Sequence, residues 1–422
     1  MRAWITGRVR GNLWRQPDFM RLWLSATIDL FGGQVVDLAL PSLAILWLKA
    51  TPAQVGLLIG LEFVGFPVLG LIAGVWADRL PRRPIMILAN VGPLLAYASI
   101  PVAFTTHSLG IVQLYAVALV TGIFNVFYEV AYQSYLPGLV ERGDLLEANQ
   151  KLEVSHSASH TVGPGIGGVV IQWVGPAWAM LSGVAALIVS TIALLFIRKP
   201  EPRRRLAEGQ ATLAFWSELR TGVRTVLDNH ILRGLMVCDA TYTLGMNMML
   251  AVWLVFAYRH VHLLPAQVGL VLSVGALGFV PGALAAAAVA RRLGLGRALV
   301  LSPFISATGI LLIAAALLGV PIVILVAAWL LIYSPAPIFD INMVSLRQAI
   351  TADHLQGRMN ATFRTAVWAA MPAGAVIGGL LGSAIGVWQT IILGGAIALL
   401  APVWLLAGPV AALRSQPEPS AA

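Results

Sequence analysis

Twelve long apolar segments limit what this chain can fold into more than any other feature of its sequence. A transmembrane α-helix needs about 20 predominantly apolar residues to cross the hydrocarbon core of a bilayer. Hydrophobic residues fill 59% of the 422 positions and charged residues only 11%, so polar groups are too few to cover such segments in water. We therefore predict an all-α membrane protein with twelve transmembrane helices, the spans, at about residues 20–48, 54–77, 84–105, 109–136, 156–175, 177–197, 231–258, 266–290, 297–319, 321–346, 360–384 and 387–412.

The basic net charge does not indicate a nucleic-acid-binding protein. The 27 Lys and Arg residues exceed the 18 Asp and Glu residues, giving a net charge of +9, but they lie in the short gaps between apolar segments, as in membrane proteins. Cys238 is the only cysteine, so neither an intrachain disulfide nor a cysteine-based metal site is expected. We expect no metal, no cofactor and no nucleic acid among the partners.

The distribution of positive charge predicts the orientation of the chain in the membrane. An even number of spans places both termini on one side, and only Lys49 and Arg259 of the basic residues fall in loops on the other. Because cytoplasmic loops carry the excess of Lys and Arg, both termini are expected in the cytoplasm. We predict a multi-pass protein of a bacterial plasma (inner) membrane.

An internal repeat divides the chain into two halves. The sequence P-A-Q-V-G-L at 52–57 recurs at 265–270, and at a similar offset Glu129 corresponds to Asp340. Two six-helix halves in parallel repeat are a known transporter plan, with the substrate site near the bilayer midplane. We expect four parts, namely an N-terminal six-helix half, a cytoplasmic linker, a C-terminal six-helix half and a cytoplasmic tail, at 1–197, 198–230, 231–412 and 413–422.

No part of the sequence is suited to ATP hydrolysis. The chain lacks the Gly-x4-Gly-Lys-Ser/Thr phosphate loop, and its longest polar segment, 198–230, is too short for a nucleotide-binding domain. Within that segment we interpret 213–227 as an interfacial helix whose basic face lies on anionic lipid. An ion gradient must therefore supply the energy for any transport.

The segment after span two reads G-V-W-A-D-R-L-P-R-R-P at 74–84 and resembles the signature loop of the major facilitator superfamily, with Pro81 where the family has Gly. A carboxylate can cap the N-terminus of a facing helix, and guanidinium groups bind carboxylates through paired hydrogen bonds. The resemblance implies the fold of that superfamily and a cytoplasmic gate in which Arg82 pairs with Glu129. Plain adherence to the positive-inside rule is the alternative for the arginines. The implied gate residues are Gly74, Asp78, Arg79, Arg82, Arg83, Glu129 and Asp340.

Span five contains the sequence S-H-T-V-G-P-G-I-G-G at 159–168 and resembles the antiporter motif of the same superfamily, with Ser in place of the first Gly. Small residues let helix backbones approach closely, and proline kinks a helix. In the family this motif is associated with exporters, whereas helix packing alone is the other interpretation. The motif residues are Ser159, Gly163, Pro164, Gly167 and Gly168.

The residues around span four narrow the resemblance further. Segment 127–140, together with Leu146-Glu147-Ala148-Asn149, is similar to the macrolide-efflux and siderophore-exporter branch, and the similarity extends over almost the whole chain. That branch often carries an acidic residue where this chain has Gly33, whereas this chain has Asp29 and Asp37 nearby. The resemblance implies an exporter whose proton site has moved along span one.

Six carboxylates fall inside the spans, and three of them are candidates for proton coupling. A charge at the bilayer centre costs about 2.5–3.5 kcal/mol on insertion scales, so such residues usually face a cavity and have a function. Asp37 and Glu62 lie closest to the midplane and are the first and second candidates, and Asp29 is the expected contact for a cation. A hydrogen-bonded strut between helices is the alternative role for each.

Polar, aromatic and methionine side chains in three spans are candidates for substrate binding. Flexible thioethers and aromatic rings suit a site that accepts varied hydrophobic molecules, although packing against lipid or other helices explains such residues as well. The excess of acidic over basic residues favours neutral or cationic substrates. The candidates are Tyr242, Met246, Asn247, Trp253, Tyr333 and Asn125.

Together these features predict a proton-coupled secondary active exporter, an antiporter that moves hydrophobic drugs or small metabolites by alternating access. Such a protein acts in multidrug efflux and antibiotic resistance, with protons, lipid and a small-molecule substrate as partners and as a monomer. One alternative is an importer or a lipid or siderophore transporter of the same fold. A non-transporting receptor or an enzyme is a more distant alternative, because no nucleophile or metal constellation is present.

Overall fold

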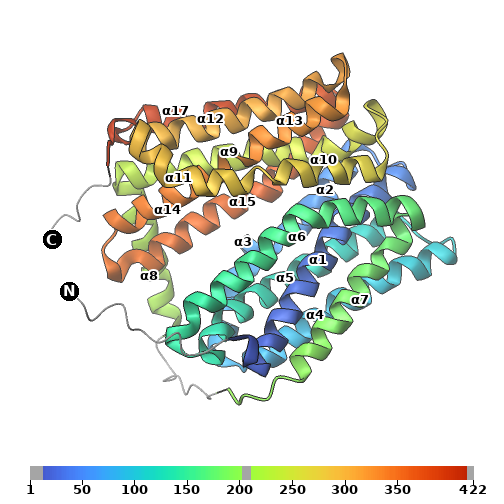
Figure 1. Cartoon of the computed structure of the whole chain (residues 1–422), viewed down its shortest axis with the longest axis horizontal. Coiled ribbons are helices and arrows are strands. Elements are labelled where there is room, and N and C mark those ends of the chain that lie inside the picture. The colour runs from blue at the N-terminus through green and yellow to red at the C-terminus, as the bar shows by residue number, and fades with distance from the viewer. Residues whose placement is uncertain (1–12, 202–210, 416–422) are drawn as a thin grey trace. The chain divides into compact units, whose positions relative to one another are not determined.

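The computed structural model describes residues 13–201 and 211–415, without the side chains at positions 71, 75, 77, 78 and 211–219. This described part is α-helical and contains no strand (Figure 1). Its long helices are α1 (Pro17–Leu46), α2 (Pro52–Phe63), α3 (Gly65–Arg79), α4 (Arg82–Thr105), α5 (Ile111–Leu139), α6 (Leu145–Val174), α7 (Pro176–Leu195), α8 (Ala211–Asp228), α9 (His230–Val255), α10 (Pro265–Ala276), α11 (Phe279–Leu293), α12 (Leu295–Ala314), α13 (Pro321–Tyr333), α14 (Ala336–Ile350), α15 (Gln356–Ala384) and α16 (Val387–Leu400). The short ones are α17 (Val403–Leu406), the π-helical turn η3 (Phe256–His260) and five 3₁₀ turns, at Leu13–Arg15, Arg142–Asp144, Ala315–Leu318, Asp353–Leu355 and Pro409–Ala412.

The predicted twelve-helix membrane fold is confirmed. Eleven helices or helix pairs of the described chain are long and apolar enough to cross a membrane. The twelfth span is α6, which begins with the polar sequence E-A-N-Q-K-L-E at 147–153 and is therefore less hydrophobic than the others. Spans two, eight and ten each consist of two consecutive helices, namely α2–α3, α10–α11 and α13–α14.

The repeated sequence at 52–57 and 265–270 builds the same helix start twice. The side chain of Gln54 accepts a hydrogen bond of 2.8 Å from the backbone N–H of Thr51, and that of Gln267 accepts one of 2.8 Å from Leu264. A side chain at this position satisfies a backbone donor that the helix itself leaves unpaired. The helices that follow also match, because α2 and α10 each have 12 residues and α3 and α11 each have 15.

The turns that precede α2 and α10 are also copies of each other. Lys49 and His262, which are 213 positions apart, both adopt a left-handed backbone with φ of 55° and 59°. The bond from Ala50 N to Ala44 O recurs as the bond from Leu263 N to Ala257 O, both at 2.9 Å. The duplication therefore extends to backbone conformation.

The chain forms two compact units, which we call the first and the second unit. The first unit comprises Met1–Leu40 and Val68–Leu206, and the second comprises Pro41–Pro67 and Ala207–Ala422. The segment 41–67 belongs to the N-terminal half by sequence but packs within the second unit, because α2 lies along α15 and α9. The units therefore differ from the halves of the sequence repeat in this one segment.

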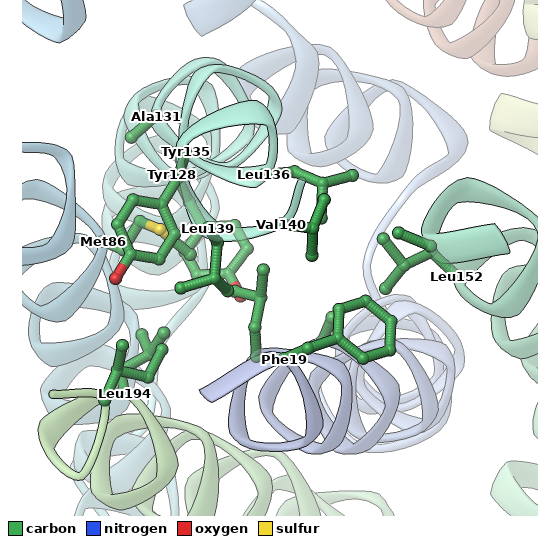
Figure 2. Packing of buried hydrophobic residues seen from close by; sticks show 14 of the residues in the cluster. Phe19, Met86, Tyr128, Ala131, Tyr135, Leu136, Leu139, Val140, Leu152 and Leu194 are labelled. Carbon is green, nitrogen blue, oxygen red and sulfur yellow. The ribbon is translucent and has the colours of Figure 1, made fainter. Parts of the chain in front are cut away.

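Buried apolar side chains from five helices form a core in the first unit. Phe19 of α1, Met86 of α4, Leu136 of α5, Leu152 of α6 and Leu194 of α7 all contribute to it (Figure 2). Removing one such side chain from a packed core costs about 2–5 kcal/mol. This core therefore fixes the relative positions of α1, α5 and α6.

Buried hydroxyl groups add polar contacts between the same helices. Ser25 Oγ on α1 lies 2.7 Å from Ser190 Oγ on α7, and Asn90 Nδ2 on α4 donates to Ser190 Oγ at 3.0 Å. Thr27 Oγ1 donates to Ser155 Oγ on α6 at 2.9 Å. Such bonds between membrane helices contribute about 0.6–2 kcal/mol each.

The linker contains a helix, as predicted, and this helix packs on the second unit. The predicted segment 213–227 falls within α8, and Val226 of α8 is fully buried in the core of the second unit. A Cβ atom at Gly222 would lie 2.8 Å from the carbonyl oxygen of Arg358, so α8 and α15 approach closely at this point. The contact of its basic face with lipid stays a prediction.

Candidate functional site

The first unit contains a cavity of about 1000 Å³ bounded by α1, α5 and α6. All of its lining residues belong to the first unit. Cavities of about 300–1000 Å³ are the size that binds drug-like molecules. Its polar lining consists of three carboxylates, four amides, two tyrosines and one histidine.

The cavity is acidic. Asp29, Glu129 and Glu153 line it, and none of its lining residues is Lys or Arg. Glu129 accepts a hydrogen bond from the amide of Gln133 one turn later, and among the described residues no ion pair joins it to Arg82, its predicted partner. A carboxylate that no cation neutralises attracts a positively charged ligand.

Two tyrosines give the cavity an aromatic wall. The rings of Tyr128 and Tyr132 on α5 are stacked, with centroids 6.1 Å apart and planes 10° apart. Aromatic faces attract cations that lie over them. Asn125, a predicted substrate contact, lines the same cavity on the same helix. The wall therefore offers apolar contact, hydrogen bonds and cation–π attraction together.

Sequence reasoning missed the contribution of α6. Asn149, Glu153 and His156 line the cavity, and the ring of His160, one turn beyond, lies 4.5 Å from that of His156. The spacing of these four residues, three or four apart, is the signal that identifies one face of a helix. It was overlooked because the first two lie before the apolar segment that defined span five.

The predicted proton-coupling residues lie in both units. Asp29 lines the cavity in the first unit. Asp37 is eight residues further along α1, about 12 Å by helical rise, and its side chain is exposed. Glu62 lies in the second unit beside Phe63, the last residue of α2, where span two is interrupted. Only Asp29 of the three contributes to the cavity lining.

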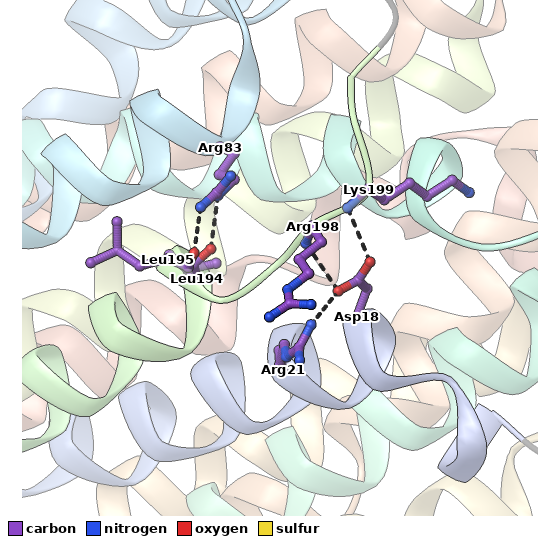
Figure 3. A network of polar contacts seen from close by, with 7 residues as sticks. All are labelled: Asp18, Arg21, Arg83, Leu194, Leu195, Arg198 and Lys199. Carbon is purple, nitrogen blue, oxygen red and sulfur yellow. Dashed lines mark hydrogen bonds and ion pairs between the residues drawn. The ribbon is translucent and has the colours of Figure 1, made fainter.

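Arg83, a predicted gate residue, binds the end of α7 (Figure 3). Its Nε and Nη2 donate to the carbonyl oxygens of Leu194 and Leu195 at 2.8 and 2.6 Å. The backbone N–H groups of Arg82 and Arg83 in turn donate to the carboxylate of Glu201 at 2.7 and 2.8 Å. A cation at a helix C-terminus and an anion at an N-terminus are both favoured by the helix dipole. These residues therefore join α4, α7 and the start of the linker.

A second carboxylate holds the start of the linker from α1. Asp18 accepts hydrogen bonds from the backbone N–H groups of Arg198 and Lys199 at 3.1 and 3.0 Å, and from the side chain of Arg21 at 2.7 Å (Figure 3). Sequence reasoning missed Asp18 and Glu201. Their role depends on contacts between residues more than 100 positions apart.

The remaining gate residues stay predictions. Arg79 is the last residue of α3 and is exposed, and a Cβ atom at Gly74 would meet no heavy atom within 4 Å. The side chain of Asp78 lies outside the described residues. Asp340 lies on α14 in the second unit.

The antiporter motif of α6 packs closely against α1. A Cβ atom at Gly163 would lie 2.6 Å from Cβ of Gln34, and one at Gly167 would lie 3.2 Å from Cα of Val35. Ser159, Pro164 and Gly168 are buried on the same helix. The small residues therefore bring the backbones of α1 and α6 together beside the cavity.

Three candidate substrate residues on α9 lie outside the cavity of the first unit. Asn247 is buried, donates to the carbonyl oxygen of Thr243 at 2.9 Å, and lies against Gly374 of α15. This position makes Asn247 part of a helix–helix contact. Tyr242 and Met246 are half-buried on the same helix.

The other two candidates in the second unit belong to a row of aromatic rings. Trp253 packs edge-to-face on Trp329 at 5.5 Å, and Trp329 contacts Tyr333 at 5.1 Å. Tyr333 in turn stacks on Phe279 at 4.9 Å. The row crosses α9, α13 and α11, and both tryptophans are almost fully buried.

Comparisons with known proteins agree with this architecture. The chain is 28% identical over 347 residues to the multidrug efflux pump Tap of Mycolicibacterium fortuitum, which covers 80% of this chain and 82% of that protein. It is 25% identical over 394 residues to the enterobactin exporter EntS of Citrobacter koseri, covering 92% of this chain and 87% of that protein.

Solved structures show the same fold at low sequence identity. A bacterial homologue of the iron transporter ferroportin in an inward-facing state matches 93% of this chain and 98% of its own, with a TM-score of 0.76 and 16% identity. The family described as transmembrane secretion effector matches residues 13–420. The chain therefore belongs to this family of major facilitator superfamily transporters, which are not enzymes.

Proposed function

We propose that the protein is a proton-driven antiporter that exports hydrophobic cations from the cytoplasm by alternating access. The observation that carries the proposal is the acidic, tyrosine-lined cavity of the first unit. A monomer suffices for this function, because a single chain forms the cavity. Export is the direction that the named relatives suggest, since one is called an efflux pump and another an exporter.

The charge of the lining supports a cationic cargo. Three carboxylates without a lining Lys or Arg attract a positive charge that enters the cavity. The stacked tyrosines supply the apolar and cation–π contacts that a hydrophobic cation requires. Amide side chains around the wall permit different hydrogen-bond patterns, which suits a transporter of varied drugs.

Proton coupling follows from competition for the same carboxylates. A carboxylate that holds a cation releases it when a proton neutralises the acid, because the attraction is then lost. Asp29 is the carboxylate that holds the cation, because it lines the cavity, and Asp37, further along the same helix, is the first candidate to carry the proton that displaces it. Glu62 is the second candidate for carrying the proton.

The test is efflux of a lipophilic cationic dye from intact bacterial cells that express the protein. Wild type should expel the dye, and an uncoupler should stop the efflux. Asp37→Asn should abolish uncoupler-sensitive efflux, and Asp29→Asn should raise KM about tenfold because an ionic contact is lost. Asp353→Asn is the matched control, since Asp353 lies in a 3₁₀ turn outside the cavity. Unchanged efflux by both Asp29→Asn and Asp37→Asn would contradict the proposal.

A siderophore is the second candidate cargo. The observation in its favour is the relative named enterobactin exporter, which this chain matches over 92% of its length. A negatively charged cargo would be repelled by the three cavity carboxylates. Competition between the cationic dye and a siderophore in the same cells distinguishes the two cargoes. Efflux of each is measured in the presence of the other, and only the better substrate inhibits efflux of the other at micromolar concentration.

A further inference from the structure

Two loops of the second unit are joined by a single arginine. Arg259 Nη2 donates to the carbonyl oxygens of Ile45 and Ala50 at 3.1 and 2.9 Å. Ile45 lies at the end of α1 and Ala50 just before α2, whereas Arg259 follows α9. We call Arg259 and these two carbonyl groups the outer latch, because all three lie on the side predicted to face outward.

The backbone around Arg259 has an unusual conformation. Residues 256–260 form a π-helical turn, a feature that is rare in proteins and frequent at functional sites. In this turn Tyr258 and Arg259 both reach the end of α1, and the hydroxyl of Tyr258 lies 2.8 Å from Ser42 Oγ in a buried contact. The turn therefore directs two successive side chains to the same partner segment.

The internal repeat shows that only one of its two copies carries the arginine of the latch. The turn after α1 is a copy of the turn after α9, with a left-handed residue at the corresponding position and matching backbone hydrogen bonds. At the offset of 213, Arg259 corresponds to Leu46, which has no charge. One copy of the turn thus supplies carbonyl groups and the other supplies the cation.

Below the latch, the contact between α2 and α15 is made mainly by small residues. A Cβ atom at Gly56 would lie 2.6 Å from Cα of Gly379, and one at Gly382 would lie 3.0 Å from Cβ of Pro52. A hydrogen bond of 2.8 Å from Ala53 N to Ser383 Oγ also runs along this contact. The latch adds to these close contacts two directional hydrogen bonds from a charged donor.

We propose that the outer latch sets how readily this transporter opens toward the outside. Segment 41–67 belongs to the N-terminal half of the repeat, and α9 and α15 belong to the C-terminal half. Rocking of the two halves must therefore separate Arg259 from its carbonyl partners in each cycle. The inference rests on the alternating access of the proposed function. Arg259 is a positioning residue, since it lies in the π-helical turn and binds backbone groups rather than cargo.

The test uses a single reporter cysteine in detergent-solubilised full-length protein, where sidedness does not matter. Val55→Cys, introduced together with Cys238→Ser, places the thiol at a fully buried position of α2, behind the latch. Arg259→Gln should raise the rate of labelling by a bulky thiol reagent about tenfold, because two hydrogen bonds to a charged donor are lost. Lys49→Gln is the matched control, since it removes the other basic residue of these loops without touching the latch.

Each outcome decides the matter. Faster labelling in Arg259→Gln alone, with Arg259→Lys intermediate, supports the latch. Equal labelling rates in wild type and Arg259→Gln, or equal acceleration by Lys49→Gln, overturn it. Labelling does not depend on cargo or protons, so the latch and the proposed export can fail separately. If Val55→Cys does not fold, hydrogen exchange of the amides in 41–67, compared between wild type and Arg259→Gln, gives the same decision.

Discussion

The sequence predicts that Glu153 lies just outside span five, whereas in the structure it lines the cavity. Span five was predicted to begin at 156, but α6 starts at Leu145 and carries its polar first turns along the cavity. A hydropathy pattern detects only the apolar part of a helix, so it missed both Asn149 and Glu153. Asp29, by contrast, was identified from sequence because an acid within an apolar helix is costly unless it faces a polar space.

At the residue scale we predict that Glu153→Gln weakens binding of cations and not of neutral molecules. Removing one of three cavity carboxylates lowers the attraction for a positive charge, so KM for a cationic dye should rise about fivefold. KM for an uncharged substrate should stay the same. Transport kinetics in everted membrane vesicles measure both values.

Glu147→Gln is the control for this prediction. Glu147 is also on α6, but it is paired with Lys151 at 3.3 Å and does not line the cavity. Its replacement should leave both KM values unchanged. A parallel rise of KM for cationic and neutral substrates in Glu153→Gln would show that the carboxylate acts through structure rather than charge.

The contact between helices α1 and α6 shows how glycines permit two helices to pack closely. The antiporter motif places Gly163 and Gly167 against Gln34 and Val35, so the pair depends on close backbone approach. A Cβ atom at Gly33, only one residue before Gln34, would meet no heavy atom within 4 Å. Neighbouring positions on these two helices therefore differ sharply in their tolerance of an added methyl group.

At the element scale we predict that Gly163→Ala destabilises the protein and that Gly33→Ala does not. A methyl group at Gly163 would overlap the side chain of Gln34, and overpacking of this kind costs about 1–3 kcal/mol. A helical Gly→Ala change in open space is neutral or stabilises by up to about 1 kcal/mol. Thermal unfolding of the two variants in detergent measures the difference. Equal melting temperatures would mean that α1 and α6 separate freely.

At the scale of the whole molecule, the distribution of Lys and Arg predicts that both termini lie in the cytoplasm and that the loop between α4 and α5 lies outside. A fluorescent protein fused after residue 422 should be bright, since it folds in the cytoplasm. Alkaline phosphatase inserted at 106–110, the loop between α4 and α5, should be active, since it requires the outer compartment. Reversed activities of the two reporters would place the termini outside and invert the direction of transport.

The sequence was sufficient for the helix count, the repeat and the linker helix, because each depends on patterns local to the chain. The interruptions of spans two and eight after Phe63 and Ala276 were not predicted, since the apolar pattern continues across both. The cavity was predicted only through Asp29, Glu129 and Asn125. Its other walls depend on which face of α6 turns inward, and this is decided by packing between distant segments.

The anchoring of residues 198–201 has a consequence for how far the molecule can open. Asp18 and the N-terminus of α4 hold this stretch on the first unit, and α8, from Ala211, packs on α15 of the second. Ten peptide links therefore join Glu201, which is held on the first unit, to Ala211, the first residue of α8 in the second unit. A fully extended chain of that length reaches roughly 35 Å. This covalent length sets an upper limit on the distance between the two anchored residues in every state of the protein.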